Sequence, residues 1–125
     1  MRMPEARVIA AADTEEGRLE HVAGRYAIPQ RFTDYRALLH EASIDAVAIL
    51  THPESHTAIG RAALEARKHV LIEKPLALQT ADCDRLIETR KKTPGKVVVG
   101  FNLRWHRLVQ EARHFINTGA LGPIK

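Results

Sequence analysis

The sequence has little of several features that mark whole classes of protein. It contains one cysteine in 125 residues, so it cannot form an internal disulfide, which is typical of a protein from a reducing compartment. Its apolar runs are much shorter than the roughly 18 residues that a membrane-spanning helix needs, which excludes a membrane span. The first residues, MRMPEARVIAAAD, have no apolar region followed by a small-residue cleavage site. We therefore expect no secretory signal and a cytoplasmic location.

Aromatic residues and excess charge are also scarce. Aromatics make up 5% of the chain, and the net charge is only +4. Nucleic-acid-binding modules usually gather Lys and Arg in one stripe, often with interleaved aromatics. Here the basic residues are scattered, apart from Arg90-Lys91-Lys92 and the stretch 104–107. The first group precedes the turn signal Thr93-Pro94-Gly95 and is typical of a solvated helix end. We therefore expect no nucleic-acid partner.

Short apolar strands alternate with amphipathic helices along the whole chain. The expected strands are 8–12, 44–50, 70–72 and 97–99. The expected helices are 14–26, a short one around 35–39, 55–68, one from Thr80, and 107–118. The segment 44–50 does not alternate between apolar and polar residues, as expected of a strand that is covered on both faces. Buried strands alternating with helices favour an α/β fold with a doubly wound parallel sheet.

Polar residues of chemical interest come directly after these strands. They are Asp13, Thr51-His52-Pro53, Glu73-Lys74-Pro75 and Gly100-Phe101-Asn102. In a doubly wound sheet, ligands bind outside the carboxyl ends of the strands. We therefore expect these residues to share one edge of the sheet and to form the functional site.

A glycine-rich turn is missing from the front of the sequence. A dinucleotide-binding sheet opens with a strand, a G-x-G-x-x-G turn and a helix, and an acidic residue follows about 20 residues later. Asp13 has the place of that acidic residue, but residues 1–12 contain no glycine, and the seven glycines of the chain nowhere have this spacing. Either the fold does not bind dinucleotides, or the chain begins inside its first βαβ unit.

Two segments decide between these alternatives. Residues 46–56 read AVAILTHPESH, and residues 62–75 read AALEARKHVLIEKP, with Glu-Lys-Pro at a strand end. Together they closely resemble the Gfo/Idh/MocA family, the glucose-fructose oxidoreductase and inositol dehydrogenase group of NAD(P)-dependent oxidoreductases. Residues 99–106 and 119–124 resemble later family motifs in the same order, so the likeness runs from Val8 to Ile124.

The resemblance implies a domain organisation. Family members begin with a Rossmann domain and continue into a larger α/β domain. Residues 1–125 would then be a partial NAD(P)-binding Rossmann domain, with an incomplete doubly wound parallel sheet that lacks its first strand and glycine-rich turn. The sheet would have a gap beside residues 8–12, and residues 119–125 would begin the connection to an absent domain. We expect such a fragment to be inactive by itself.

The resemblance also implies roles for the residues at the strand ends. Asp13 would accept hydrogen bonds from the adenosine ribose, which favours NAD, whereas Arg18 would reduce discrimination against NADP. The alternative for Asp13 is a helix N-cap. Lys74 is the candidate catalytic residue, because a lysine can bind the reacting hydroxyl and stabilise or relay its charge. Glu73 would face the nicotinamide ribose, and Pro75 would fix the turn.

The remaining candidates lie in two loops. Thr51 and Pro53 match the loop along the cofactor, and Asn102 and Arg104 match the nicotinamide end of the crevice. His52, Glu54 and His56 raise the alternative of a metal site. Pro53 is expected to start a helix and to leave His52 outside it, and no third ligand has suitable spacing. We therefore expect no metal, and we interpret His56 as a hydrogen-bonded structural residue.

The sequence thus predicts the cofactor-binding part of an oxidoreductase that transfers hydride between NAD(P) and a sugar, cyclitol or related hydroxyl or carbonyl substrate. The intact protein would be a homo-oligomer, as family members usually are. One alternative is a non-catalytic nucleotide-binding regulator of the same family, against which Lys74 argues. Another is a stand-alone structural or interaction fragment.

Overall fold

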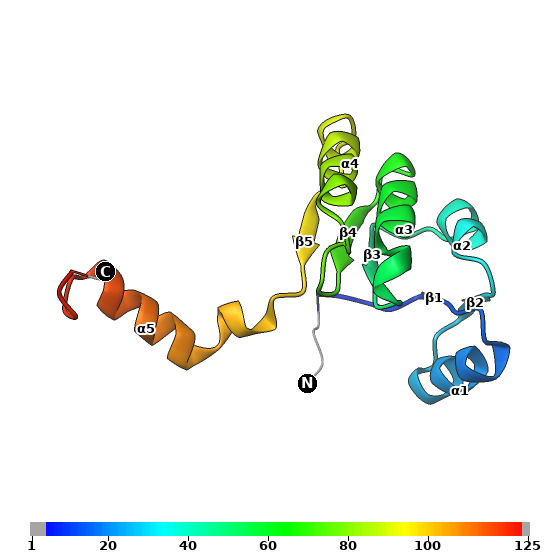
Figure 1. Ribbon diagram of the computed structural model, residues 1–125. Helices are drawn as coiled ribbons and strands as arrows, with labels where there is room; N and C mark the ends of the chain where they lie inside the picture. Colours follow the sequence, from blue (N-terminus) through cyan, green and yellow to red (C-terminus); the bar gives the residue numbers. More distant parts are fainter. Residues whose placement is uncertain (1–4, 124–125) are drawn as a thin grey trace.

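The computed structural model describes residues 5–123 (Figure 1). Residues 1–4 lie outside this part, and so do Ile124 and Lys125, where the expected connection to another domain ends. The elements in chain order are β1 (Ala10–Ala12), α1 (Glu16–Tyr26), β2 (Gln30–Phe32), α2 (Tyr35–Glu41), β3 (Ala46–Ile49), α3 (Pro53–Glu65), β4 (His69–Ile72), α4 (Thr80–Lys91), β5 (Val97–Val99), the 3-10 helix η1 (Asn102–Trp105) and α5 (Arg107–Asn117). The predicted alternation of strands and helices is confirmed.

The strands form two parallel sheets. β1 pairs with β2 in one sheet, and β3, β4 and β5 lie in that order in the other. Ile49 lies opposite Ile72, which in turn lies opposite Val99, so the three strands of the second sheet end almost level. Within the described residues, β1 and β3 are not hydrogen-bonded to each other. The expected interruption of the sheet beside β1 is therefore present.

The main core lies between the second sheet and the helices α3 and α4. Ile49, Ile72, Leu64 and Leu86 are almost completely buried there. Gly60 allows α3 to approach closely, because a Cβ at this position would lie 3.0 Å from both Ile72 Cδ1 and Leu86 Cδ2. A small residue at this contact thus fixes how near α3 lies to β4 and α4.

The expectation of strands covered on both faces was wrong for the described residues. In β4, Val70 and Ile72 are buried, but Leu71 between them is 42% exposed. Val98 in β5 is 55% exposed, and Val8, expected in a buried strand, precedes β1 and is 70% exposed. Successive side chains of a strand point to opposite faces. One face packs on α3 and α4, whereas no described element covers these residues on the other.

Helix α5 extends away from both sheets (Figure 1). Its large apolar side chains, Leu108, Val109, Phe115 and Ile116, are 44–57% exposed. Gly119 follows it with a φ of +72°, a left-handed conformation that glycine adopts readily. None of the helices in the described part is long and apolar enough to cross a membrane.

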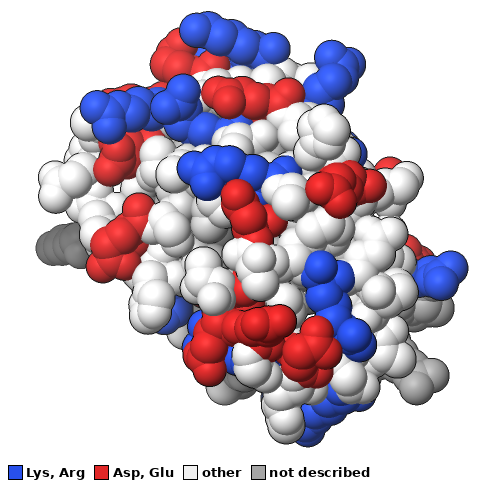
Figure 2. Space-filling view, turned by 90° about the vertical axis from the view of Figure 1, so that its right-hand side faces the viewer, with Lys and Arg blue, Asp and Glu red and all other residues white. Residues whose placement is uncertain are grey.

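Charged side chains of both signs are mixed over the face shown in Figure 2. The described residues include ion pairs within one helix turn, such as Arg61–Glu65 on α3 and Lys91–Glu88 on α4. Exposed pairs of this kind contribute little to stability, because water and salt screen them. The burial of apolar side chains in the core must therefore supply most of the stability.

Gly95 provides a test of the packing between the start of β5 and the end of α3. A Cβ at Gly95 would lie 2.4 Å from the Lys68 carbonyl oxygen and 2.7 Å from Leu64 Cδ2, and Gly95 is buried. We expect Gly95→Ala to lower the free energy of unfolding by roughly 1–3 kcal/mol, measured by urea denaturation. Gly24→Ala on α1 is the control, because nothing lies within 4 Å of its added Cβ. An equal loss in both variants would contradict the close approach at Gly95.

Candidate functional site

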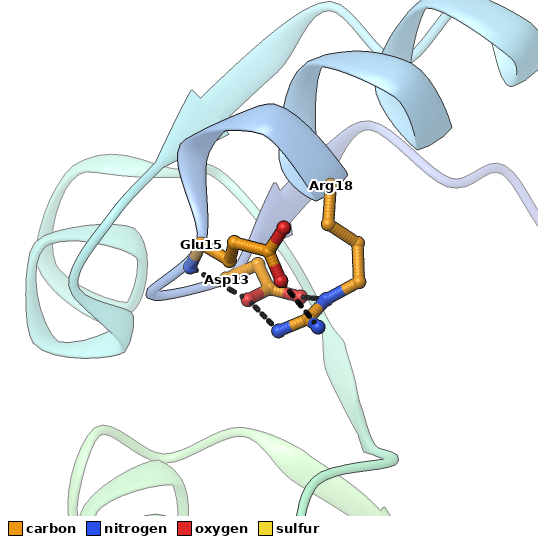
Figure 3. Close-up of polar contacts among 3 residues, drawn as sticks. All are labelled: Asp13, Glu15 and Arg18. Carbon is orange, nitrogen blue, oxygen red and sulfur yellow. Dashed lines mark hydrogen bonds and ion pairs between the residues drawn. The ribbon is translucent and has the colours of Figure 1, made fainter.

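Asp13 lies directly after β1, where its backbone N–H donates to the Phe32 carbonyl at 3.1 Å. Its carboxylate accepts three hydrogen bonds (Figure 3). The Glu15 backbone N–H donates to Oδ1 at 2.9 Å, while Arg18 donates through Nε to Oδ2 at 2.5 Å and through Nη2 to Oδ1 at 2.6 Å. Arg18 Nη1 also lies 2.7 Å from Glu15 Oε2. Arg18 thus forms a bidentate ion pair with the Asp13 carboxylate.

This arrangement sets the charge of Asp13. The hydrogen bond from Arg18, followed by that from the Glu15 N–H, lowers the pKa of Asp13 to about 2. Asp13 is therefore ionised throughout the physiological pH range, and an ionised carboxylate only accepts hydrogen bonds. The alternative of an N-cap does not hold, because the N-cap of α1 is Glu15 and receives no side-chain cap. Asp13 is bonded to the turn before the helix.

Thr51 and Pro53 lie where β3 passes into α3. Pro53 is the first residue of α3, and His52 is its N-cap, so the prediction that His52 lies outside the helix is confirmed. Ser55 Oγ donates to the His52 carbonyl at 2.8 Å and lies 2.7 Å from Thr51 Oγ1. Because a serine hydroxyl carries one hydrogen, Thr51 is the donor in this second bond. No cluster of metal-ligating side chains occurs in residues 5–123.

Glu73, Lys74 and Pro75 follow β4 at the same edge. The Glu73 N–H donates to the Ile49 carbonyl at 3.0 Å, and Glu73 Oε2 accepts from the Lys74 N–H at 2.7 Å. The Lys74–Pro75 peptide bond is cis. The Lys74 side chain is exposed, and its ammonium group takes part in none of the ion pairs of the described residues. It is therefore available to bind another molecule.

Gly100 completes this edge beside Glu73. Its N–H donates to the Ile72 carbonyl at 2.8 Å, and a Cβ here would lie 3.1 Å from Glu73 Oε1. Asn102 and Arg104 follow on η1 and are exposed. In the described part of the chain they make no hydrogen bond to residues 51–75. The structure thus brings Thr51, Glu73 and Lys74 to one sheet edge, with Asn102 and Arg104 beyond it and Asp13 in the other sheet.

Sequence reasoning missed Ser55, and it placed Gly100 at this edge without predicting its role. Ser55 orients the Thr51 hydroxyl, and the signal for it was a second hydroxyl residue four positions along in the first helical turn. Gly100 leaves room for the Glu73 carboxylate, a role that follows only from the pairing of β4 with β5. His56, interpreted as a hydrogen-bonded structural residue, is buried and contacts two carbonyl oxygens, as predicted.

Comparison with known proteins identifies the family. A family model described as an oxidoreductase family with an NAD-binding Rossmann fold matches residues 1–101. The chain belongs to the Gfo/Idh/MocA family. The resemblance expected from the Glu-Lys-Pro segment is thereby confirmed, together with its Rossmann-like fold class. The Gfo/Idh/MocA family is one of oxidoreductases, so a dehydrogenase is the class of enzyme to which the chain is related.

Two curated proteins and one solved structure also match most of this chain. Inositol 2-dehydrogenase from Salmonella paratyphi B is 34% identical over 117 residues, which cover 92% of this chain and 35% of that protein. Myo-inositol 2-dehydrogenase from Thermotoga maritima is 31% identical, with 94% and 35% covered. The structure of scyllo-inositol dehydrogenase from Lactobacillus casei, with bound NAD(H) and scyllo-inositol, matches with a TM-score of 0.89 at 25% identity, covering 98% of this chain and 36% of that one. The chain thus spans about a third of the length of these relatives.

The ion pair of Asp13 predicts a specific titration. In Arg18→Gln the main cause of the lowered pKa is removed, so the pKa of Asp13 should rise from about 2 toward the ordinary value of about 3.9, as measured by NMR of the side-chain carboxyl carbon. Because the folded pKa is the lower one, the pair stabilises the fold above about pH 4 and this contribution is lost as the pH falls through about 2.

Arg36→Gln on α2 is the matched control, because Arg36 pairs with Asp34 instead. This variant should leave the Asp13 titration unchanged. An Asp13 pKa that stays near 2 in Arg18→Gln would show that Arg18 does not hold the carboxylate in solution.

Proposed function

We propose that this chain is the cofactor-binding part of an NAD-dependent oxidoreductase that acts on a sugar, cyclitol or related hydroxyl or carbonyl compound. The observation that carries the proposal is the edge of β3, β4 and β5, where Glu73 is fixed beside Gly100 and the Lys74 ammonium forms no ion pair with any residue of 5–123. The names of the relatives, inositol dehydrogenases among them, support the substrate class. The presence of Lys74 at the end of β4 favours an enzyme over a non-catalytic nucleotide-binding regulator.

The residues of the strand ends fit different parts of NAD. The ionised Asp13 carboxylate would accept hydrogen bonds from the adenosine ribose and repel a 2′-phosphate, which favours NAD over NADP. Arg18 reduces this repulsion, because it neutralises Asp13 directly. The carboxylate of Glu73 is suited to the hydroxyls of the second ribose. Thr51 and Pro53 would lie along the cofactor, and Pro75 would fix the turn that presents Glu73 and Lys74. Asn102 and Arg104 would line the nicotinamide end of the site.

Lys74 would act on the substrate. When bound, NAD supplies the acceptor for the hydride that leaves the alcohol carbon. Loss of the hydride is accompanied by breaking of the hydroxyl O–H bond, whose proton would pass to water as the carbonyl double bond forms, and negative charge develops on the oxygen during this step. The Lys74 ammonium can donate a hydrogen bond to this oxygen and stabilise the charge. Its exposed position at the carboxyl end of β4 matches the place where ligands bind in parallel sheets.

The chain does not contain a cradle for the pyrophosphate. No G-x-G-x-x-G sequence occurs in its 125 residues, so the backbone N–H groups that such a turn offers to phosphate are lacking. We therefore propose that the chain by itself binds NAD weakly, through the ribose and nicotinamide ends, and does not turn over substrate.

A titration of the ¹⁵N-labelled chain with NAD tests the assigned edge. We expect chemical-shift changes at residues 12–15, 51–56, 73–76 and 100–104, with a dissociation constant well above about 1 µM. Asp13→Asn should reduce the changes at 12–15, whereas Asp34→Asn, at the N-cap of α2, should not. Changes confined to the opposite end of the strands, around Lys68 and Thr93, would contradict the site, and a micromolar constant would contradict weak binding.

A second measurement concerns turnover. We expect no formation of NADH when the chain is incubated with NAD and myo-inositol, because the pyrophosphate cradle is lacking and residues outside this chain would complete the substrate site. Sustained NADH absorbance, lost in Lys74→Met and retained in Lys92→Met, would refute inactivity of the chain while supporting the assignment of Lys74.

A further inference from the structure

The second sheet has an apolar face that no described element covers. Ala48, Leu71 and Val98 lie side by side across it, because Ala48 pairs with Leu71 and Leu71 with Val98 in the strand register. All three are exposed, and we call this row the open sheet face. Its three strands, spaced about 4.8 Å apart, make it about 10 Å wide, which is the diameter of one α-helix.

Helix α5 carries a second apolar surface that no described element covers. Four large side chains form it, and we call them the α5 face: Leu108, Val109, Phe115 and Ile116. Residues seven and eight positions after the first pair return to the same side of a helix, so the four share one face. The helix has 11 residues and is therefore about 16 Å long, which is enough to cross the open sheet face.

The 3-10 helix η1 and α5 form an arm that leads away from the sheets (Figure 1). The Gln110 side-chain amide donates to the Arg104 carbonyl, and His106 Nδ1 accepts from the Leu108 N–H at 3.3 Å. These hydrogen bonds tie the first turn of α5 to η1. In this arrangement the α5 face stays clear of the open sheet face of its own chain, whereas the open sheet face of a second copy is accessible to it.

The exposed apolar area limits which contacts can hold two copies together. A half-exposed large apolar side chain presents roughly 100 Å² of surface, so one α5 face on one open sheet face buries about 600 Å², the size of a crystal-packing contact. Two α5 faces against each other would bury about 800 Å², which is still below a specific interface, and would leave both sheets open. Two contacts of the first kind bury about 1,200 Å², which reaches the lower limit of specific interfaces.

We propose that two copies of this chain exchange their α5 arms. The α5 face of each copy packs on the open sheet face of the other. A twofold axis relates the two contacts, so the assembly closes as a dimer and does not extend into a fibre. This dimer involves neither the cofactor nor the substrate, so the inference goes beyond the proposed function and does not depend on it.

Sedimentation equilibrium of the chain gives the first test. At roughly 100 µM, without cofactor, we expect a dimer of twice 14.0 kDa with a micromolar dissociation constant. Phe115→Lys should raise this constant at least about a hundredfold, because the apolar contact is lost at both interfaces. Tyr26→Lys on α1 is the matched control, because Tyr26 is an aromatic residue that is 65% exposed outside both faces. A monomeric wild-type chain, or equal weakening by the two variants, would overturn the proposal.

A second variant distinguishes the arm exchange from a contact between two α5 helices. Val98→Lys places a charge on the open sheet face and leaves α5 unchanged, so it should weaken the dimer as strongly as Phe115→Lys does. Circular dichroism checks that the variant is folded. A folded Val98→Lys chain that dimerises as the wild type does would overturn the exchange.

The wild-type dimer gives a further test that needs no variant at a sheet position. In a mixture of differently isotope-labelled copies, nuclear Overhauser effects should connect the Phe115 ring of one copy with the Leu71 and Val98 methyl groups of the other. Effects between the Phe115 rings of two copies, or between these groups within one chain only, would overturn the proposal. No cofactor is present in these measurements, so their failure would leave the proposed function untouched.

Discussion

The in-register parallel pairing of β3, β4 and β5 is the constraint on which the candidate site depends. Each strand ends opposite its neighbour, so Thr51, Glu73 and Gly100 leave the sheet at one edge although they are far apart in sequence. The Glu73 and Gly100 N–H groups extend the pairing one step past the strands. The backbone pairing therefore sets the positions of these residues. The Glu73 carboxylate fits at this edge because the neighbouring Gly100 has no side chain.

Much of this edge could be predicted because its signals are local. Glu73-Lys74-Pro75 follows an apolar run, and proline cannot donate in a ladder, so the end of β4 was evident from the sequence. The burial of each strand face was not predictable in the same way. Leu71 lies between the buried Val70 and Ile72, and Val98 lies between two partly buried valines, yet they are 42% and 55% exposed, because exposure depends on what packs over them. The two carbonyl partners of His56 were likewise beyond the sequence, since they come from separate loops.

Asp13 and Lys74 of the proposed site have different electrostatic surroundings. Arg18 donates two hydrogen bonds to Asp13, whose pKa is lowered to about 2. The Asp13 carboxylate is therefore ionised, and the positive charge of Arg18 partly neutralises it. Lys74 has no acidic partner among the described residues and keeps all three of its donors available. A carboxylate that recognises hydroxyls can share its oxygens with an arginine, because each oxygen accepts more than one hydrogen bond. A lysine that binds a developing charge acts best when no carboxylate competes for it.

Helix α5 and one face of the second sheet both expose large apolar side chains in the described part of the chain. α5 has its apolar residues on one face, as a helix does when that face packs against another element, yet Phe115 and Ile116 are about half exposed. Within the described residues α5 contacts mainly η1, so its direction is not set by core packing. The match to scyllo-inositol dehydrogenase nevertheless covers 98% of this chain with a TM-score of 0.89, which places α5 much as in a protein nearly three times as long. The apolar faces of α5 and of β4 and β5 are therefore exposed surfaces suited to packing against another element.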